Sequence, residues 1–137
     1  MSIYEIITII ASIIGLFISI LAIWYSRKQH LSSIKPELWT NGVLINQYNL
    51  FFDIGSRKNT AKIIKITPKT NNITIISKCP IEIPEGEDEV CQIKVEYKGD
   101  INKIDNDPIV FDIKYTDKEN NKYQCTYTYS KQICSIK

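Results

Sequence analysis

The residues from Ile6 to Tyr25 form an unbroken run of 20 residues without a charged side chain. As an α-helix, such a run spans roughly 30 Å, which is the thickness of the hydrocarbon core of a bilayer. Trp24 and Tyr25 close the run, at the place where amphipathic aromatic side chains anchor to lipid headgroups. The sequence therefore predicts a transmembrane helix within residues 1–28.

A cleaved signal peptide is the alternative interpretation of this run. It needs positive charge before the apolar residues and small residues at a cleavage site after them. Here Glu5 precedes the run, whereas Arg27, Lys28 and His30 follow it, which favours a retained span. Because basic flanks stay in the cytoplasm, we expect a single-pass protein of the cell inner membrane with its N-terminus outside.

Small and polar residues recur in this segment at alternating steps of three and four. The resulting period of 3.5 residues draws a straight line along a helix in a left-handed bundle. Apart from Ala11, the other sides of the run carry bulky apolar residues that suit lipid. We call this line the seam; it consists of Glu5, Thr8, Ser12, Gly15, Ser19, Ala22 and Ser26.

The seam has two functional interpretations, and both imply a parallel homo-oligomer. In the first, small residues let helices pack closely while hydroxyl groups bond between them. In the second, the same residues line a pore, and Glu5 adds a ring of carboxylates at its outer mouth, which favours cations. A span that does not associate at all is the third possibility, since Ser and Thr are common in single spans.

Residues 36–137, which follow the membrane segment, carry no net charge. Of the 17 basic residues, three precede Pro36, and of the 15 acidic residues, one does. A neutral body of about 100 residues can hold one modest core, which is too little for a Rossmann or barrel enzyme. Its neutrality also argues against bulk binding of duplex nucleic acid.

After a juxtamembrane linker, residues 29–36, the pattern changes to the alternation of half-buried strands. The polar segment 117–121 fits the turn of a hairpin between the last two strands. About seven strands with this rhythm predict an all-β antiparallel sandwich over residues 37–137. The expected strands lie near 39–45, 50–54, 64–66, 73–77, 91–97, 109–115 and 123–129.

The segment Ile81–Glu87, followed by a strand and by a late hairpin that ends at Lys122–Tyr129, resembles bacterial immunoglobulin-like domains. The resemblance covers most of residues 36–137. It implies an immunoglobulin-like fold and carries no function.

Four cysteines, Cys79, Cys91, Cys125 and Cys134, have no Cys-x-x-Cys spacing, and the single histidine adjoins the membrane segment. A metal site is therefore not expected. Cys91 and Cys125 share the parity of apolar neighbours, which predicts buried thiols, and most tyrosines are expected in the core for the same reason. Two disulfides are the alternative, and they would invert the topology.

Two charge clusters stand out. In the interpretation without a function, both clusters are solvated loops. In the functional interpretation, the basic cluster gathers on one hairpin and binds a phosphorylated ligand or the anionic inner leaflet, while the acidic cluster pairs with a neighbouring subunit. The basic cluster is Arg57, Lys58, Lys62, Lys65 and Lys69, and the acidic one is Glu85, Glu87, Asp88 and Glu89.

No catalytic constellation is visible. The five glycines are isolated, so no phosphate-binding loop occurs, and His30 has no nucleophile placed near it. We therefore expect a protein that is not an enzyme and that needs no cofactor.

A membrane segment joined to a small β domain resembles short bacterial membrane effectors of anti-phage defence. The resemblance implies that a nucleotide or short oligonucleotide signal binds the cytosolic domain and controls a membrane-permeabilising bundle, with the basic cluster as the candidate ligand site. The alternative function is a membrane-tethered adaptor whose sandwich binds a protein partner, for instance by strand addition. A third hypothesis is an exported domain with two disulfides.

Overall fold

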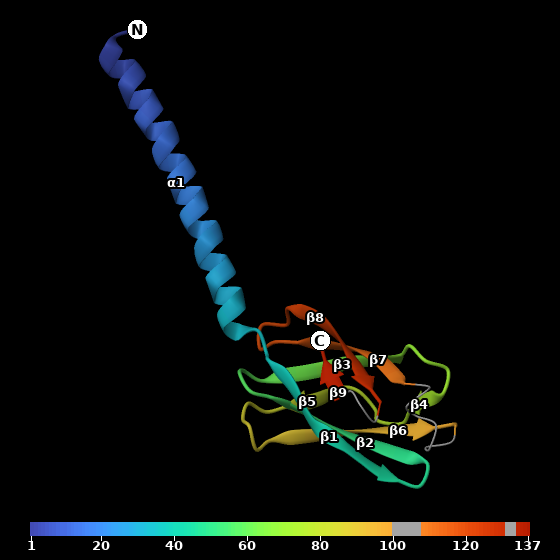
Figure 1. The fold of residues 1–137 in the computed structure, drawn as a ribbon. Helices are drawn as coiled ribbons and strands as arrows, with labels where there is room; N and C mark the ends of the chain where they lie inside the picture. The colour runs from blue at the N-terminus through green and yellow to red at the C-terminus, as the bar shows by residue number, and fades with distance from the viewer. Residues whose placement is uncertain (100–107, 131–133) are drawn as a thin grey trace. The chain divides into compact units, whose positions relative to one another are not determined.

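The computed structural model describes residues 1–99, 108–130 and 134–137. The chain divides into two compact units, Met1–Ile34 and Lys35–Lys137. The first unit is the helix α1 (Ile3–Ile34), and the second contains only strands and loops in its described residues (Figure 1).

Helix α1 has a defined beginning and a defined end. The backbone N–H of Ser2 donates to the Glu5 carboxylate at 2.7 Å, and the Glu5 N–H donates to the Ser2 hydroxyl at 3.3 Å. This reciprocal pair is a capping box, which satisfies two N–H groups at the helix start. Pro36 sets the end, because a proline disfavours helical geometry in the residue before it.

The helix is longer than the sequence predicted. The sequence predicts a linker over residues 29–36, but α1 continues to Ile34. These residues contain neither proline nor glycine, so nothing stops the helix before Pro36. By its length and composition alone, helix α1 could cross a membrane, and none of its apolar stretch is buried.

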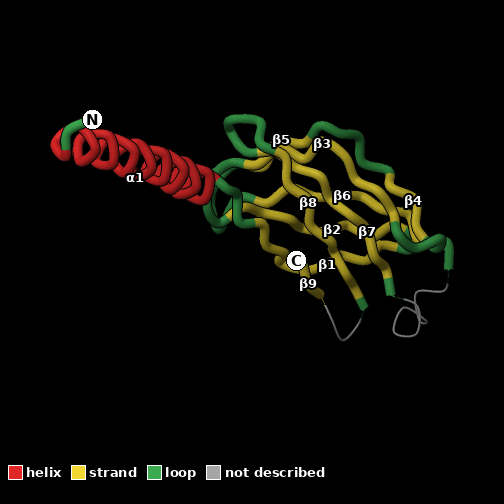
Figure 2. Tube along the Cα trace, turned by 90° about the horizontal axis from the view of Figure 1, so that it is seen from above, coloured by secondary structure: helices red, strands yellow, loops and turns green. Residues whose placement is uncertain are grey.

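The second unit is built from nine described strands in two antiparallel sheets. The four-stranded sheet has the order β1-β2-β6-β4, and the five-stranded sheet has the order β5-β3-β7-β8-β9 (Figure 2). The strands are β1 (Leu38–Asn46), β2 (Asn49–Ser56), β3 (Ala61–Pro68), β4 (Ile73–Ile75), β5 (Ile81–Ile83), β6 (Val90–Tyr97), β7 (Ile109–Thr116), β8 (Lys122–Tyr129) and β9 (Cys134–Ile136).

The predicted antiparallel β-sandwich is confirmed, with a higher strand count. The sequence predicted about seven strands, and the two additional ones, β5 and β9, have three residues each. A strand of three residues is too short to display the alternation on which the prediction rested. The predicted turn at 117–121 does join paired strands, since β7 and β8 pair from Thr116↔Lys122 to Ile109↔Tyr129.

The core lies between the two sheets and has an aromatic centre. Phe52 of β2 makes edge-to-face contacts with three rings of the opposite sheet, with centroid distances of 5.2 Å to Phe111, 5.0 Å to Tyr127 and 5.8 Å to Tyr129. Phe111 and Tyr127 stack on each other at 5.0 Å. Edge-to-face and stacked pairs are the preferred aromatic geometries, so this cluster joins the sheets.

Most cysteines and tyrosines on the apolar side of an alternating strand are buried, as the sequence predicts. Cys125 is buried, and Cys91 is half-buried against the core, where its thiol lies 3.0 Å from the Glu82 carbonyl oxygen. Tyr97, Tyr115 and Tyr127 are buried, while Tyr123 and Tyr129 pack against the core from its margin. All four thiols are free.

Gly55 is required by a close approach of two strands. A Cβ atom at this position would lie 2.6 Å from Nε1 and 2.8 Å from Cε2 of Trp39. Trp39 of β1 is the cross-strand partner of Gly55 in β2. Real Cβ atoms do not approach neighbours this closely, so the indole would have to move. We expect Gly55→Ala to lower the free energy of unfolding by about 1–3 kcal/mol, measured by urea denaturation in detergent.

The matched control for this prediction is the double variant Gly55→Ala/Trp39→Ala. Removal of the indole makes room for the new methyl group, so the two effects should couple and the double variant should lose less than the sum of the single ones. Strict additivity would contradict the proposed steric cause.

Candidate functional site

The seam follows one side of a single uninterrupted helix. Its hydroxyl groups donate to carbonyl oxygens one turn earlier: Thr8 to Tyr4 at 2.8 Å, Ser12 to Thr8 at 2.8 Å, and Ser19 to Gly15 at 2.9 Å. These donors are therefore satisfied within the helix, while the hydroxyl oxygens keep lone pairs that can accept from a neighbour.

Two seam residues have a further local feature. The Glu5 carboxylate is the acceptor of the capping box with Ser2, so it has a structural role at the start of α1. Gly15 has no heavy atom within 4 Å of the position that a Cβ atom would take. A larger side chain at Gly15 is therefore free of steric conflict in the single chain.

The five residues of the predicted basic cluster are not brought together on one hairpin. β2 and β3 belong to different sheets, so the connection between them is a crossover. The Arg57 guanidinium lies 5.8 Å from the centre of the Trp39 ring, and Lys69 forms an ion pair with Asp112 at 3.6 Å. Lys58 is exposed in the crossover, so only Lys62 and Lys65 remain together on one strand.

A different basic cluster forms on the outer side of the five-stranded sheet. Lys65 of β3 stands directly opposite Lys114 of β7, and Thr116 stands between Lys62 and Lys122 in the next row. All four lysines are exposed. We call this cluster the lysine face; it consists of Lys62, Lys65, Lys114 and Lys122.

One acid stands directly opposite the lysine face, since Glu82 of β5 is the cross-strand partner of Lys62, and the other three lysines have no acid opposite them in the sheet. Within the described residues, none of its four lysines forms an ion pair. Asp112 lies one row away and is occupied, since it accepts from the Thr126 hydroxyl at 2.7 Å and pairs with Lys69. Like charges directly opposite in a sheet are destabilising, so the register of Lys65 and Lys114 has a cost that an anion would remove.

The lysine face is shallow. A hollow of about 260 Å³ lies on it, lined by Ile64, Lys114, Lys122, Tyr123 and Gln124. Ile64 is the extra residue of a β-bulge between Ile63 and Lys65, which leaves its side chain exposed. The hollow is smaller than a usual small-molecule site, so the face is better suited to a broad anionic surface.

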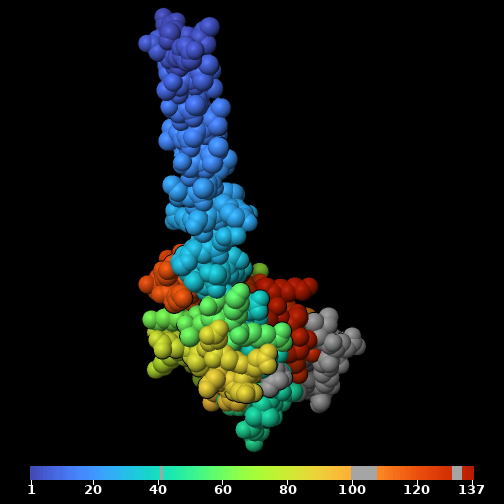
Figure 3. Space-filling view, turned by 90° about the vertical axis from the view of Figure 1, so that its left-hand side faces the viewer, coloured from blue at the N-terminus to red at the C-terminus, as the bar shows by residue number. Residues whose placement is uncertain are grey.

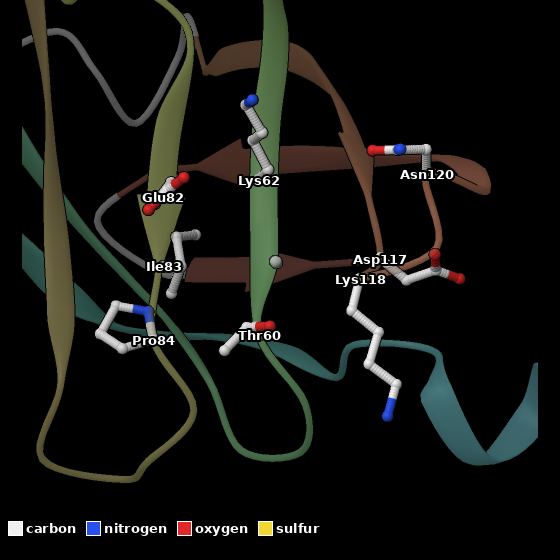
Figure 4. Close-up of a pocket in the computed structure, with 9 residues that line it drawn as sticks. Thr60, Lys62, Glu82, Ile83, Pro84, Asp117, Lys118 and Asn120 are labelled. Carbon is white, nitrogen blue, oxygen red and sulfur yellow. The ribbon is translucent and has the colours of Figure 1, made fainter.

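A larger pocket of about 590 Å³ lies beside the lysine face, between β3, β5 and the turn that joins β7 to β8 (Figure 4). Lys62 and Lys118 both line it, but Figure 4 shows that their ammonium groups point in opposite directions. Glu82 and Asp117 supply two carboxylates to the same lining. The pocket therefore does not concentrate positive charge on one ligand.

The Asp117 carboxylate is fully engaged by the turn. Its Oδ1 accepts from the backbone N–H groups of Glu119 and Asn121, and its Oδ2 accepts from the side chains of Asn121 and Tyr123. Burial alone would raise the pKa of Asp117, but the four hydrogen bonds outweigh it and the pKa is lowered. This carboxylate holds the hairpin and is not available as a catalytic base.

Three thiols and one phenol of the sandwich are also poor nucleophiles. Burial raises the pKa of Cys125 to about 11 and raises the pKa values of Cys79 and Cys91. Burial, with the hydrogen bond to Asp117, raises the pKa of Tyr123 to about 12. Protonated groups of this kind do not attack a substrate at neutral pH. No group of three metal-ligating side chains occurs among the described residues.

The acidic cluster lies in the loop between β5 and β6. Glu85 is held there, because its carboxylate accepts from the Asn59 backbone N–H at 2.9 Å. Glu87, Asp88 and Glu89 are exposed. Figure 3 shows this part of the chain, in yellow, on the surface of the sandwich beside the green of β3.

Sequence reasoning missed Lys114 and Lys122 as members of a cluster. The alternation of β7 did place Lys114 on the side opposite Ile113 and Tyr115, and the hairpin turn did imply that β8 runs beside it. The missing information was the pairing of β3 with β7, which joins residues that are 49 positions apart in Lys65↔Lys114.

Comparisons with known proteins add little to this geometry. No protein-family model matches the chain, and no curated protein matches it. One similar solved structure is a FixG-related protein from Vibrio parahaemolyticus, which is 12% identical and has a TM-score of 0.37. The match covers 72% of this chain and 97% of that one.

Proposed function

We propose that this chain is a single-pass inner-membrane protein with its N-terminus outside and its β-sandwich in the cytoplasm. The charge-free run of α1 matches the thickness of a bilayer core, and Arg27, Lys28 and Lys35 follow it. Glu5 is the only charged side chain before the run. A basic flank of this kind is retained on the cytoplasmic side.

The helices associate through the seam, and the sandwich controls that association. The observation that carries this proposal is that five of the six small or hydroxyl residues between Ile6 and Trp24 lie on one line of the helix. Small residues allow close helix contact, and such contact does not require hydrogen bonds between the hydroxyl groups of two helices.

The activity that follows is membrane permeabilisation by the assembled helices, governed by what the sandwich binds. The role is not enzymatic, since the Asp117 carboxylate is occupied by its turn and the pKa values of three thiols are raised by burial. A permeabilising effector of bacterial anti-phage defence is the biological setting we propose. The ligand candidates are a nucleotide or a short oligonucleotide.

The second candidate is a membrane-tethered adaptor. It is favoured by the hydroxyl donors of the seam, which are already satisfied within the helix and so do not require a water-filled pore. β1 is also an edge strand of nine residues, and such an edge can accept a strand of a protein partner.

Gly15→Leu in the full chain tests the proposal. Because Gly15 has open space around it in the single chain, any effect of the substitution reports on a neighbouring helix. We expect a smaller oligomer in detergent, measured by light scattering, and loss of the depolarisation that expression causes in bacterial cells, measured with a membrane-potential dye. Ile10→Phe adds bulk on the opposite side of the helix and should change neither result.

The outcomes separate the candidates. An oligomer without depolarisation in the unsubstituted chain favours the adaptor. A chain that is monomeric in detergent at every concentration contradicts association through the seam, and both Gly15→Leu and Ile10→Phe would then be silent.

A further inference from the structure

We propose that the lysine face docks on the anionic headgroups of the same bilayer that α1 crosses. This inference rests on the proposed function only in that α1 is a membrane span, and it is independent of helix association and of permeabilisation. It gives the sandwich a second contact with the membrane, through a sheet face.

The first argument is electrostatic. The lysine face presents four exposed amines without an ion pair among the described residues, and Lys65 and Lys114 stand directly opposite each other. Each lysine near an anionic surface is attracted by it, and the attractions add over a patch. A layer of phosphates would also relieve the repulsion within the face.

The second argument is shape. The hollow on the face, about 260 Å³, is too small for a whole nucleotide-sized ligand. A nearly flat array of lysines, which are flexible point charges, matches a layer of headgroups better than it matches one enclosed phosphate. Ile64, exposed by the bulge, gives the middle of the array an apolar side chain that can lie among the headgroups.

The third argument is the position of the face along the chain. Lys35 is the first residue of the sandwich unit, and its ammonium group lies 5.4 Å from the centre of the Tyr123 ring. Tyr123 lines the same hollow as Lys114 and Lys122. The chain therefore enters the sandwich at the margin of the lysine face.

The distance from the bilayer is short in consequence. The charge-free run ends at Tyr25 and α1 ends at Ile34, so the nine helical residues that precede Lys35 rise roughly 14 Å. Electrostatic attraction decays over about 8–10 Å at physiological salt, so a sandwich tethered at this length samples the attractive layer continually. A soluble protein with the same face would bind far more weakly.

The experiment compares lysine reactivity in two membranes. The full chain is reconstituted in nanodiscs of phosphatidylcholine, alone or with about 30% phosphatidylglycerol, and is briefly acetylated and analysed by mass spectrometry. We expect acetylation of the lysine face to slow by about fivefold in the anionic discs and to recover in high salt. Lys94 of β6, in the other sheet, and Lys98, which directly follows β6, are internal controls whose acetylation should not change.

A pair of variants gives a second readout that does not depend on acetylation. Lys65→Gln/Lys114→Gln should lose the slowing of hydrogen exchange that anionic lipid causes in β3 and β7. Lys94→Gln/Lys98→Gln removes the same charge from the opposite sheet and should keep it. Both pairs replace exposed or half-buried side chains, so the fold is expected to survive.

Three results would overturn the inference. Equal acetylation in both membranes excludes docking. If anionic lipid slows acetylation of Lys94 and Lys98 as much as that of the lysine face, the cause is general screening by the lipid. The face would instead bind a soluble ligand if tripolyphosphate slows its acetylation in phosphatidylcholine discs and anionic lipid does not. A chain that does not co-elute with discs at all contradicts the membrane span instead, which separates this failure from that of the proposed function.

Discussion

Phe52→Ala is expected to lower the free energy of unfolding of the sandwich by about 3–5 kcal/mol, which is a large part of the total stability of a domain of this size. The Phe52 side chain is fully buried and meets Phe111, Tyr127 and Tyr129 across the two sheets. Its removal leaves a cavity that these rings cannot close without leaving their preferred geometry. Urea denaturation of the full chain in detergent, followed by near-UV circular dichroism, measures the effect.

The neighbouring residue supplies the matched control. Phe51 lies on the outer side of β2, half-buried beneath Lys94, whose ammonium group is 5.9 Å from the ring centre. Phe51→Ala removes the same atoms from the surface, and we expect it to cost only about 1 kcal/mol. Equal costs for the two variants would contradict the assignment of Phe52 to the centre of the core.

Much of the fold could be predicted because alternation reports local burial directly. In β7, Ile109, Phe111 and Ile113 are buried, and Asp112 and Lys114 face outward, as their parity predicted. The same logic found the β7–β8 hairpin, whose turn is rich in polar residues. It failed for β5 and β9, where three residues give no readable period and pairing with β3 and β8 decides the structure.

The candidate site could be predicted less well, because closeness in sequence was taken for closeness in space. A crossover between the two sheets separates Arg57 from Lys62. Arg57 contacts the Trp39 ring, and Lys69 forms an ion pair with Asp112. The lysine face instead depends on the register of β3 with β7. A bulge at Ile64 sets that register, and no local pattern announces it.

The helix shows the opposite balance. The seam depends only on the α-helical period, so residue spacing in the sequence is enough to predict it. What the spacing did not contain was the state of the hydroxyl groups, which donate to their own helix. Helix association through the seam would therefore depend on the close packing of Gly15 and Ala22, which needs no hydroxyl donor.

Asp117→Asn is expected to destabilise the sandwich by about 2–4 kcal/mol at neutral pH, since a buried charged acceptor with four hydrogen bonds is replaced by a group that accepts through one oxygen only. The substituted amide would present donors to the side-chain amide of Asn121, which is itself a donor there. Because this turn sets β7 beside β8, loosening it should also disorder the pairing of Lys122 with Thr116.

The pH dependence of this variant distinguishes charge from shape. The folded pKa of Asp117 lies below its ordinary value of 3.8, so the carboxylate stabilises the fold fully above that value. Its contribution disappears as the pH falls below 3.8 through the lower folded pKa. The stability gap between the unsubstituted chain and Asp117→Asn should therefore be constant above about pH 5 and narrow below it. Glu87→Gln, at an exposed carboxylate of the loop between β5 and β6, is the control and should leave that narrowing intact. A gap that stays constant down to the acid transition would mean that the geometry of the turn, and not the charge of its carboxylate, holds the hairpin.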